Sequence, residues 1–164
     1  MSKEFDGRST HTIDNKGRVF IPQTFRDILG ENFVISLADN LKTPAFFTSE
    51  AWEERSKRYG RISKTDRKAH MITLMLHGNT FKDYNCDNQG RVLIPQSLRE
   101  YFKFKEGEEV TLVGSGDSLE LWSIAAYNAQ MDQLFSTEVI PDNNVDRLLD
   151  YIEDKYYAKD AEQA

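Results

Sequence analysis

Residues 14–26 read DNKGRVFIPQTFR, and residues 87–99 read DNQGRVLIPQSLR. At an offset of 73 residues, nine of these thirteen positions carry the same amino acid, and the other four are mild exchanges. Such an internal repeat indicates two copies of one structural unit within the chain. The identical pairs are Asp14/Asp87, Asn15/Asn88, Gly17/Gly90, Arg18/Arg91, Val19/Val92, Ile21/Ile94, Pro22/Pro95, Gln23/Gln96 and Arg26/Arg99.

Each copy predicts a tight turn, a short strand and a short helix. Aspartate at the first position and glycine at the fourth fit a type I turn that closes a hairpin. The following Val-Phe-Ile or Val-Leu-Ile predicts a strand buried on both faces. Pro22 and Pro95 then end the strand and suit the first turn of a helix. The helix residues expected in the core are Phe25, Ile28 and Leu29 in the first copy, and Leu98, Tyr101 and Phe102 in the second.

The remaining segments of the two copies match as well, so the fold class predicted is α+β, with the two units packed as a pseudo-twofold pair. Gly30 and Gly107 are expected to mark helix exits. The expected strands cover 33–37, 45–47, 81–86, 110–113 and 119–122. The expected helices cover 49–59, 65–77 and 123–135, and a fourth follows Pro141. The helix at 65–77 has Ala69, Ile72 and Leu76 on one face. The helix after Pro141 is amphipathic, with an apolar face formed by Val145, Leu148, Leu149, Ile152 and Tyr156.

The predicted domain organisation follows from these segments. A first unit occupies 5–60, a helical connector 61–79, a second unit 80–135, and an acidic extension with an amphipathic helix 136–164. Units of about 50–60 residues bury little surface alone, and the natural partner of each unit is its twin.

Composition favours a cytoplasmic protein. Of the 164 residues, 39% are apolar and 29% charged, and no apolar run approaches the roughly 20 residues that span a bilayer. The start, MSKEFDGRSTH, lacks the hydrophobic segment of a secretion signal. A single cysteine, Cys86, permits no internal disulfide.

The net charge of −6 is unevenly distributed. Residues 142–164 contribute −4 of it, with seven acids and three bases, which leaves −2 for residues 1–141. Residues 55–68 hold seven bases against one acid. This stretch is either a second phosphate-facing strip or a solvated helix surface, and the solvated surface is favoured because charge runs usually have no partner.

Arg18 and Arg91 each follow a tight turn, and arginine is the side chain that best reads guanine in the major groove. If a pseudo-twofold axis relates the units, both arginines could lie on one face. Lys16 at the first turn tip could touch phosphate, whereas its counterpart Gln89 is neutral. The sequence leaves two interpretations open, because Asp14 and Asp87 flank the same turns and such pairs often only clamp a hairpin. A carboxylate could also accept from cytosine N4.

These segments resemble the two signature segments of the MraZ family of bacterial transcription regulators, which are built from tandem AbrB-like (SpoVT-AbrB) units. The resemblance rests on DNKGRVFIP and DNQGRVLIP, on FDGRSTHTIDNKGR at the start, and on GRVLIPQSLREYF followed by VTLVGSGDSLELW. It covers about residues 5–135. The acidic tail and Gln89 depart from the pattern.

The resemblance implies a swapped-hairpin-like β-barrel shared by the two halves, and ring-shaped homo-oligomers. It also implies binding to double-stranded DNA at short direct repeats upstream of the division and cell-wall gene cluster, and a cytoplasmic, nucleoid-associated location. The DNA contacts would come from the D-x-x-x-R segments. The residues expected at the DNA are Asp14, Lys16, Arg18, Asp87, Gln89 and Arg91.

Other functions find little support in the sequence. His11, His70 and His77 lack metal-ligand spacing with Cys86, so no metal is expected. No nucleotide-binding or hydrolase motif occurs, so we expect no catalytic site, cofactor, small-molecule substrate or membrane partner. The runner-up function is a protein-interaction module, antitoxin-like or an assembly factor, whose turns contact a protein.

Overall fold

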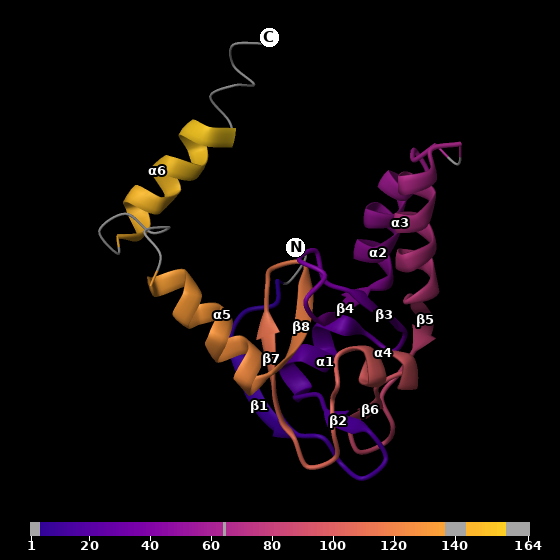
Figure 1. Ribbon diagram of the computed structural model, residues 1–164. Helices are drawn as coiled ribbons and strands as arrows, with labels where there is room; N and C mark the ends of the chain where they lie inside the picture. Colours follow the sequence, from indigo (N-terminus) through magenta and orange to yellow (C-terminus); the bar gives the residue numbers. More distant parts are fainter. Residues whose placement is uncertain (1–3, 64, 137–143, 157–164) are drawn as a thin grey trace. The chain divides into compact units, whose positions relative to one another are not determined.

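The structure is a computed structural model that describes residues 4–63, 65–136 and 144–156 (Figure 1). Its contacts group the chain into two units, Met1–Ile124 and Ala125–Ala164. The first unit contains both copies of the repeated segment. The second contains most of α5 (Ile124–Ser136) and all of α6 (Val145–Tyr156). The domain boundaries at residues 60, 79 and 135 stay a prediction.

The two copies run through matching elements. The first copy gives β1 (Arg8–Thr12), β2 (Arg18–Phe20), α1 (Gln23–Leu29), β3 (Phe33–Leu37), β4 (Pro44–Thr48) and α2 (Ser49–Tyr59). After α3 (Arg67–Gly78), the second copy gives β5 (Phe81–Tyr84), β6 (Arg91–Leu93), α4 (Gln96–Tyr101), β7 (Glu109–Gly114), β8 (Ser118–Ser123) and α5. Pro22 and Pro95 are the N-cap residues that directly precede α1 and α4, one position before the first turn predicted for them.

The strands interleave the two copies. A six-stranded antiparallel sheet has the order β1-β7-β8-β4-β3-β5, and β2 pairs with β6 in a separate two-stranded ribbon. The first strand of each copy therefore pairs with a strand of the other copy, β1 with β7 and β5 with β3. Strands β1, β3 and β4 of the first copy correspond to β5, β7 and β8 of the second. Replacing each strand by its counterpart reverses the order of the sheet, as a twofold relation requires. The predicted α+β fold with a pseudo-twofold relation is confirmed.

The predicted turn is present, but its flanking strands do not pair with each other; they are exchanged between the two copies, as the swapped-hairpin arrangement implied by the family resemblance requires. Asp14 donates its backbone N–H to the Arg18 carbonyl at 3.0 Å, which closes the turn. The strands on either side nevertheless find partners in the other copy, because β1 joins the large sheet and β2 joins the ribbon. The tight turn thus connects two sheets.

The β2–β6 ribbon is centred on Val19, which lies opposite Val92. Both valines are fully buried, but the neighbouring Phe20 and Leu93 are 39% and 47% exposed. The predicted burial of these strands on both faces is therefore wrong. The ribbon alternates as a surface strand does, with one face on the core and one face in solvent.

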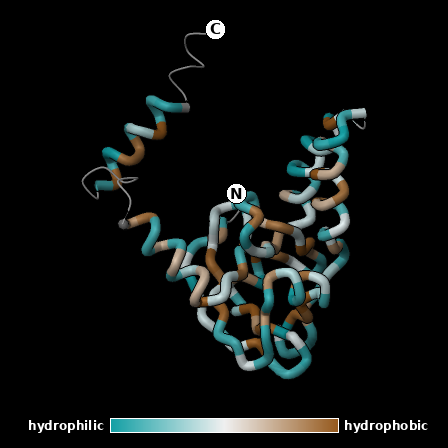
Figure 2. Tube along the Cα trace, viewed as in Figure 1, coloured by the Kyte–Doolittle hydropathy of each residue, from teal (hydrophilic) through white to brown (hydrophobic). Residues whose placement is uncertain are grey.

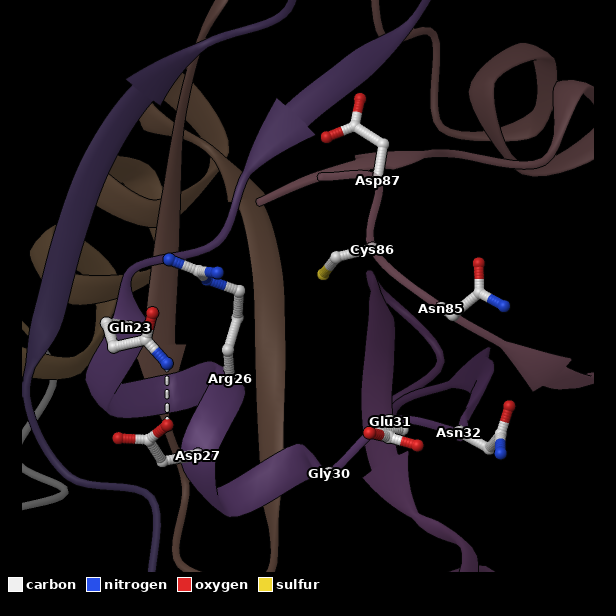
Figure 3. Close-up of a pocket in the computed structure, with 9 residues that line it drawn as sticks. All are labelled: Gln23, Arg26, Asp27, Gly30, Glu31, Asn32, Asn85, Cys86 and Asp87. Atoms are coloured by element: carbon white, nitrogen blue, oxygen red, sulfur yellow. Dashed lines mark hydrogen bonds between the residues drawn. The ribbon is translucent and has the colours of Figure 1, made fainter. Parts of the chain in front are cut away.

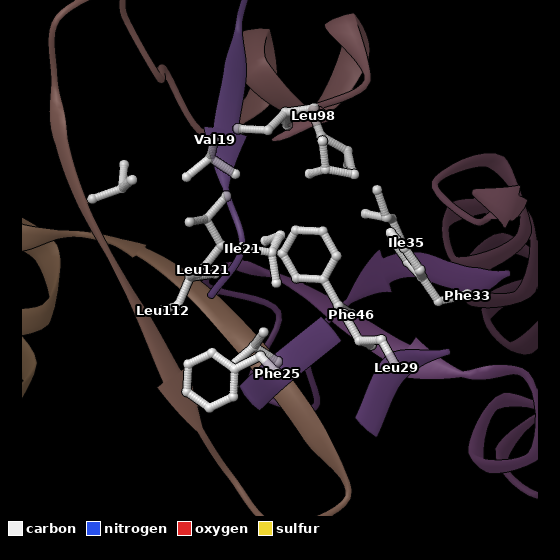
Figure 4. Close-up of a cluster of buried hydrophobic side chains, with 14 of the residues drawn as sticks. Val19, Ile21, Phe25, Leu29, Phe33, Ile35, Phe46, Leu98, Leu112 and Leu121 are labelled. Carbon is white, nitrogen blue, oxygen red and sulfur yellow. The ribbon is translucent and has the colours of Figure 1, made fainter. Parts of the chain in front are cut away.

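The core of the first unit lies between the ribbon, the large sheet and the short helices (Figure 4). Both copies contribute to it. Burying each such aliphatic or aromatic side chain contributes roughly 1.5–3 kcal/mol. The residues labelled in Figure 4 are Val19, Ile21, Phe25, Leu29, Phe33, Ile35, Phe46, Leu98, Leu112 and Leu121.

The repeat also links the copies through glycine and arginine. Gly17 and Gly90 adopt positive φ angles of 84° and 80° at the turns. A Cβ on Gly17 would overlap the Arg99 guanidinium, whose Nε donates to the Ile94 carbonyl at 2.9 Å. In the mirrored contact, a Cβ on Gly90 would lie 2.9 Å from Cζ of Arg26. Each turn thus rests on an arginine from the helix of the other copy.

Most other predicted elements are confirmed, with three differences. Tyr101 is 65% exposed and Ile72 is 50% exposed, so neither belongs to the core. Gly107 lies beyond α4, which ends at Tyr101, and donates its N–H to the Ile13 carbonyl. The predicted amphipathic helix after Pro141 corresponds to α6, along which hydrophobic and hydrophilic residues alternate (Figure 2). Pro141 and the Tyr156 side chain lie outside the described residues.

We predict that Gly17→Ala destabilises the protein more than Gly116→Ala. Both glycines have a φ of 84°, so each alanine costs about 1–2 kcal/mol of backbone strain. Only the Gly17 variant must also displace Arg99, because Gly116 has open space around its Cβ position. Losing a hydrogen bond from a charged donor adds roughly 1.5–3 kcal/mol. Free energies of unfolding in urea measure the difference, and equal losses would show that the Arg99 contact contributes nothing.

Candidate nucleic-acid interface

The first turn is fixed by one carboxylate. Gly17 donates its N–H to the Asp14 carbonyl at 3.1 Å, and Oδ1 of Asp14 accepts from the backbone N–H groups of Lys16 and Arg18, both at 2.9 Å. Oδ2 of Asp14 accepts from Nε of Arg18 at 2.7 Å. Both oxygens of a single side chain therefore hold the turn and the arginine together.

The second turn repeats this arrangement. Oδ1 of Asp87 accepts from the backbone N–H groups of Gln89 at 2.9 Å and Arg91 at 3.0 Å, and Oδ2 accepts from Nε of Arg91 at 2.9 Å. The clamp interpretation of the Asp/Arg pairs is thus correct for the structure of both turns.

The clamp orients each arginine without burying it. The side chains of Arg18 and Arg91 are 21% and 31% exposed, so neither lies inside the core. The clamp engages Nε, which is one edge of the planar guanidinium. Among the described residues, the structure records no ion pair of Arg91 beyond Asp87. A carboxylate that fixes the plane of an arginine fork also preorganises that fork for a planar acceptor.

The structure brings the two turns together. Nη1 of Arg18 lies 3.7 Å from Oδ2 of Asp87, so the carboxylate of the second turn is shared between the two copies. Arg18 begins β2 and Arg91 begins β6, and each directly precedes a buried valine. Because successive side chains of a strand point to opposite faces, the arginines point away from the valines. Both arginines therefore lie on the outward face of one ribbon. Lys16 and Gln89 are exposed at the tips of the two turns.

The clamp also sets the acidity of its carboxylates. Burial alone would raise the pKa of Asp14, but hydrogen bonds from the Arg18 backbone and side chain and from the Lys16 N–H bring that pKa below its ordinary value. For Asp87, the hydrogen bond from the Arg91 backbone leads the causes that lower its pKa. Both carboxylates are therefore ionised in the folded protein at neutral pH, as the clamp requires.

Sequence reasoning missed four residues around the turns. Phe20 and Leu93 stand exposed on the same ribbon face as the arginines, although they were predicted to be buried. Arg26 and Arg99 support the turns of the opposite copy, and their Nε atoms donate to the carbonyls of Ile21 and Ile94. A signal for this second pair existed, because it is among the nine identical positions.

A polar pocket lies beside the second turn (Figure 3). Cys86 lines it together with Arg26 and Asp87, and Nε2 of Gln23 donates to Oδ1 of Asp27 at 2.6 Å. Burial raises the pKa of the Cys86 thiol, an effect that the nearby Arg26 partly opposes. The thiol is thus held in its less nucleophilic protonated form.

The described part of the basic stretch, residues 55–63 and 65–68, lies away from the ribbon. It includes the end of α2 and the start of α3, and these helices extend from the end of the first unit opposite β2 and β6 (Figure 1). Arg55 within it pairs with Asp39 and Lys57 with Glu54. The stretch therefore does not continue the surface formed by the two turns.

The described residues contain no group of three or more histidine, cysteine, aspartate and glutamate side chains placed to hold a metal ion. None of the helices among them has both the length and the apolar character needed to cross a bilayer.

An interlocked pair of repeats with a clamped arginine at each turn defines an α+β protein that carries two arginines on the outward face of one ribbon. The family model that matches the chain, described as "MraZ protein, putative antitoxin-like", matches twice, at residues 5–74 and 75–148. The chain belongs to the MraZ family, which confirms the two repeats and the resemblance found in the sequence.

Relatives agree over most of the chain. The "Transcriptional regulator MraZ" of Carboxydothermus hydrogenoformans is 36% identical, covering 76% of this chain and 84% of that protein. Proteins of the same name from Methylobacillus flagellatus (32% identical, 83% and 92% covered) and Desulforamulus reducens (33% identical, 88% and 99% covered) are also similar. The solved structure "The solution structure of PHS018 from pyrococcus horikoshii" covers 74% of this chain and 95% of that one. The two chains share 18% sequence identity, with a TM-score of 0.32.

We predict that the two clamps make stability fall in acid. The lowered pKa values of Asp14 and Asp87 mean that their contribution is complete above the ordinary carboxyl value of 3.8 and is lost as the pH falls toward the folded-state values. Replacing both residues with asparagine should lower stability at neutral pH and flatten its decline between about pH 5 and about pH 2. Urea unfolding at several pH values measures this. An unchanged decline in the double variant would show that the clamps do not titrate as described.

Proposed function

We propose that this protein is a sequence-specific DNA-binding transcription regulator that reads double-stranded DNA through its two D-x-x-x-R turns. The observation that carries the proposal is the placement of Arg18 and Arg91 on the outward face of one ribbon, each oriented by a carboxylate. The relatives' name, transcriptional regulator, supports the same class. A regulator of this kind is not an enzyme.

The ribbon suits the major groove. A two-stranded β ribbon fits its width, and an arginine fork matches the O6 and N7 acceptors of guanine. Two forks on one ribbon would each face a base edge of the same duplex. Asp14 and Asp87 would act mainly by holding the forks, and Lys16 would contact a phosphate beside the groove.

Charge argues for action as an oligomer. Few cations per protomer would release few counterions, so one protomer would bind weakly and with strong salt dependence. Joining several weak sites in a ring-shaped homo-oligomer makes the later contacts intramolecular and raises avidity by orders of magnitude. The DNA sites that match such an oligomer are short direct repeats, which we place in the promoter region upstream of the division and cell-wall gene cluster. The protein would then act in the cytoplasm, at the nucleoid.

A protein-interaction module is the alternative. The description "antitoxin-like" of the family favours it, and so do the exposed Phe20 and Leu93 on the ribbon. Under this alternative the turns would contact a protein, and the arginines would pair with its carboxylates.

We predict that replacing Arg18 and Arg91 with alanine strongly weakens binding to the promoter DNA upstream of its own gene. Each bidentate contact to guanine discriminates by about 1–3 kcal/mol, so losing both should weaken binding by at least thirtyfold. Gel shifts measure this, with mass measurements to show an intact oligomer. Arg58→Ala, in the exposed basic stretch, is the matched control and should bind normally. Unchanged DNA binding by the double variant, with loss of a protein partner, would favour the alternative.

The repeat provides a second matched pair for the phosphate contact. Lys16→Ala should reduce the slope of log affinity against log salt by about one for each contacting protomer, across all sequences. Gln89→Ala, at the equivalent position, removes no charge and should leave the slope unchanged. Binding isotherms over a salt series test this, and equal slopes for both variants and the unmodified protein would remove Lys16 from the interface.

A further inference from the structure

The outward face of the β2–β6 ribbon carries four side chains, Arg18, Phe20, Arg91 and Leu93. In the antiparallel register, Arg18 lies opposite Leu93, and Phe20 lies opposite Arg91. Directly opposite residues on one face have Cβ atoms about 4.5–5.5 Å apart. Each arginine therefore has a large apolar neighbour, supplied in each case by the other copy of the repeat.

The core does not require these two apolar side chains. Phe20 is 39% and Leu93 47% exposed, whereas Val19 and Val92 between them are fully buried. A single exposed apolar residue is ordinary on a protein surface. Here two of them stand at the same position of both copies, each opposite a clamped arginine.

Phe20 is held in position by its surroundings, and Leu93 lies at a shallow hollow. The Phe20 ring meets the His11 ring edge-on at 5.5 Å between centroids, and the Arg26 guanidinium lies 5.8 Å from its centre. A Cβ on Gly90 would lie 3.1 Å from the same ring, so Phe20 packs at the base of the second turn. Leu93 lines a shallow hollow with Tyr84, the counterpart of His11 at the offset of 73. A held apolar surface loses little conformational freedom when it is covered.

We infer that Phe20 and Leu93 are specificity-determining residues that contact thymine methyl groups in the bound DNA. The inference rests on the proposed DNA binding and deepens it. Thymine is the base that presents an apolar group, its C5-methyl, in the major groove. A leucine or phenylalanine beside an arginine fork would cover that methyl while the fork bonds to a neighbouring guanine. The DNA site would then contain a guanine and a thymine at neighbouring positions at each of the two contacts.

The arginines on the same face favour DNA over an apolar protein surface. An apolar partner that covered Phe20 and Leu93 would also desolvate Arg18 and Arg91, and burying such charges is unfavourable without matched acceptors. The major groove offers both kinds of group side by side, acceptors on guanine and a methyl on thymine.

The test uses DNA that differs only in this methyl group. The full-length protein is titrated with the promoter duplex upstream of its own gene, and with the same duplex carrying deoxyuridine in place of every thymidine. Fluorescence anisotropy gives both dissociation constants, and their ratio is the readout. We expect the unmodified protein to bind the uridine duplex about fourfold more weakly for each methyl that it covers. Uridine at single positions then locates those methyls.

Substitutions tie the effect to the two side chains. Leu93→Ala and Phe20→Ala should each weaken binding to the thymidine duplex and bring the ratio closer to one. Leu93→Met should keep most of the ratio because it stays apolar. Leu74→Ala is the matched control, since Leu74 is 53% exposed on α3, and it should leave the ratio unchanged. Thermal unfolding monitored by circular dichroism confirms that each variant is folded.

Each outcome decides the inference. A ratio of one for the unmodified protein, with binding still dependent on Arg18 and Arg91, overturns the thymine contact and leaves the proposed function standing. A ratio that persists in both alanine variants also overturns it. Failure of the unmodified protein to bind either duplex removes the proposed function together with the inference. Variants with normal DNA binding but an altered oligomer mass would show that Phe20 and Leu93 contact a second copy of the chain instead.

Discussion

The pairing of β2 with β6 is the interaction on which the rest of this structure depends. Val19 and Val92 meet at its centre with no exposed surface, and their burial fixes which face of each strand points outward. A slip of one residue would send the valines into solvent and the arginines into the core. Exposing the valines and burying the arginines are both unfavourable, so the register of the ribbon is strongly specified. The positions of Arg18 and Arg91 therefore follow from core packing.

The two copies support each other around this ribbon. The Ile21 N–H donates to the Gly90 carbonyl at 2.8 Å, and the Ile94 N–H donates to the Gly17 carbonyl at 3.0 Å. Each copy therefore provides the backbone partner for the other copy's turn. Neither half completes the ribbon and its two turns alone, so both copies of the repeated segment are needed to form them. The tips of the two turns differ in charge, because the first carries Lys16 and the second carries Gln89.

The sequence predicted local structure better than it predicted pairing. Turn, strand and proline follow from short-range constraints, since glycine supplies the positive φ angle and proline ends the ladder, and these predictions hold. The strand partners do not follow from these constraints, because the turn at Asp14–Arg18 looks like that of a simple hairpin, and the exchange between the copies was expected only from the family resemblance. All three residues of the run Val19-Phe20-Ile21 are apolar, so the sequence shows no alternation of polar and apolar residues. The exposure of Phe20 in the middle of this run therefore could not be predicted from the pattern. The clamp geometry was predictable from the Asp/Arg spacing, whereas the support from Arg26 and Arg99 depends on contacts between the copies.

The central claim is that the ribbon and its two turns form the surface that meets DNA. Hydrogen–deuterium exchange of the full-length protein, with and without the promoter duplex, tests it most directly. The account predicts that DNA slows backbone exchange at residues 14–20 and 87–93 together, with little change at residues 55–68. Protection confined to 55–68, with both turns exchanging as in the free protein, would contradict it.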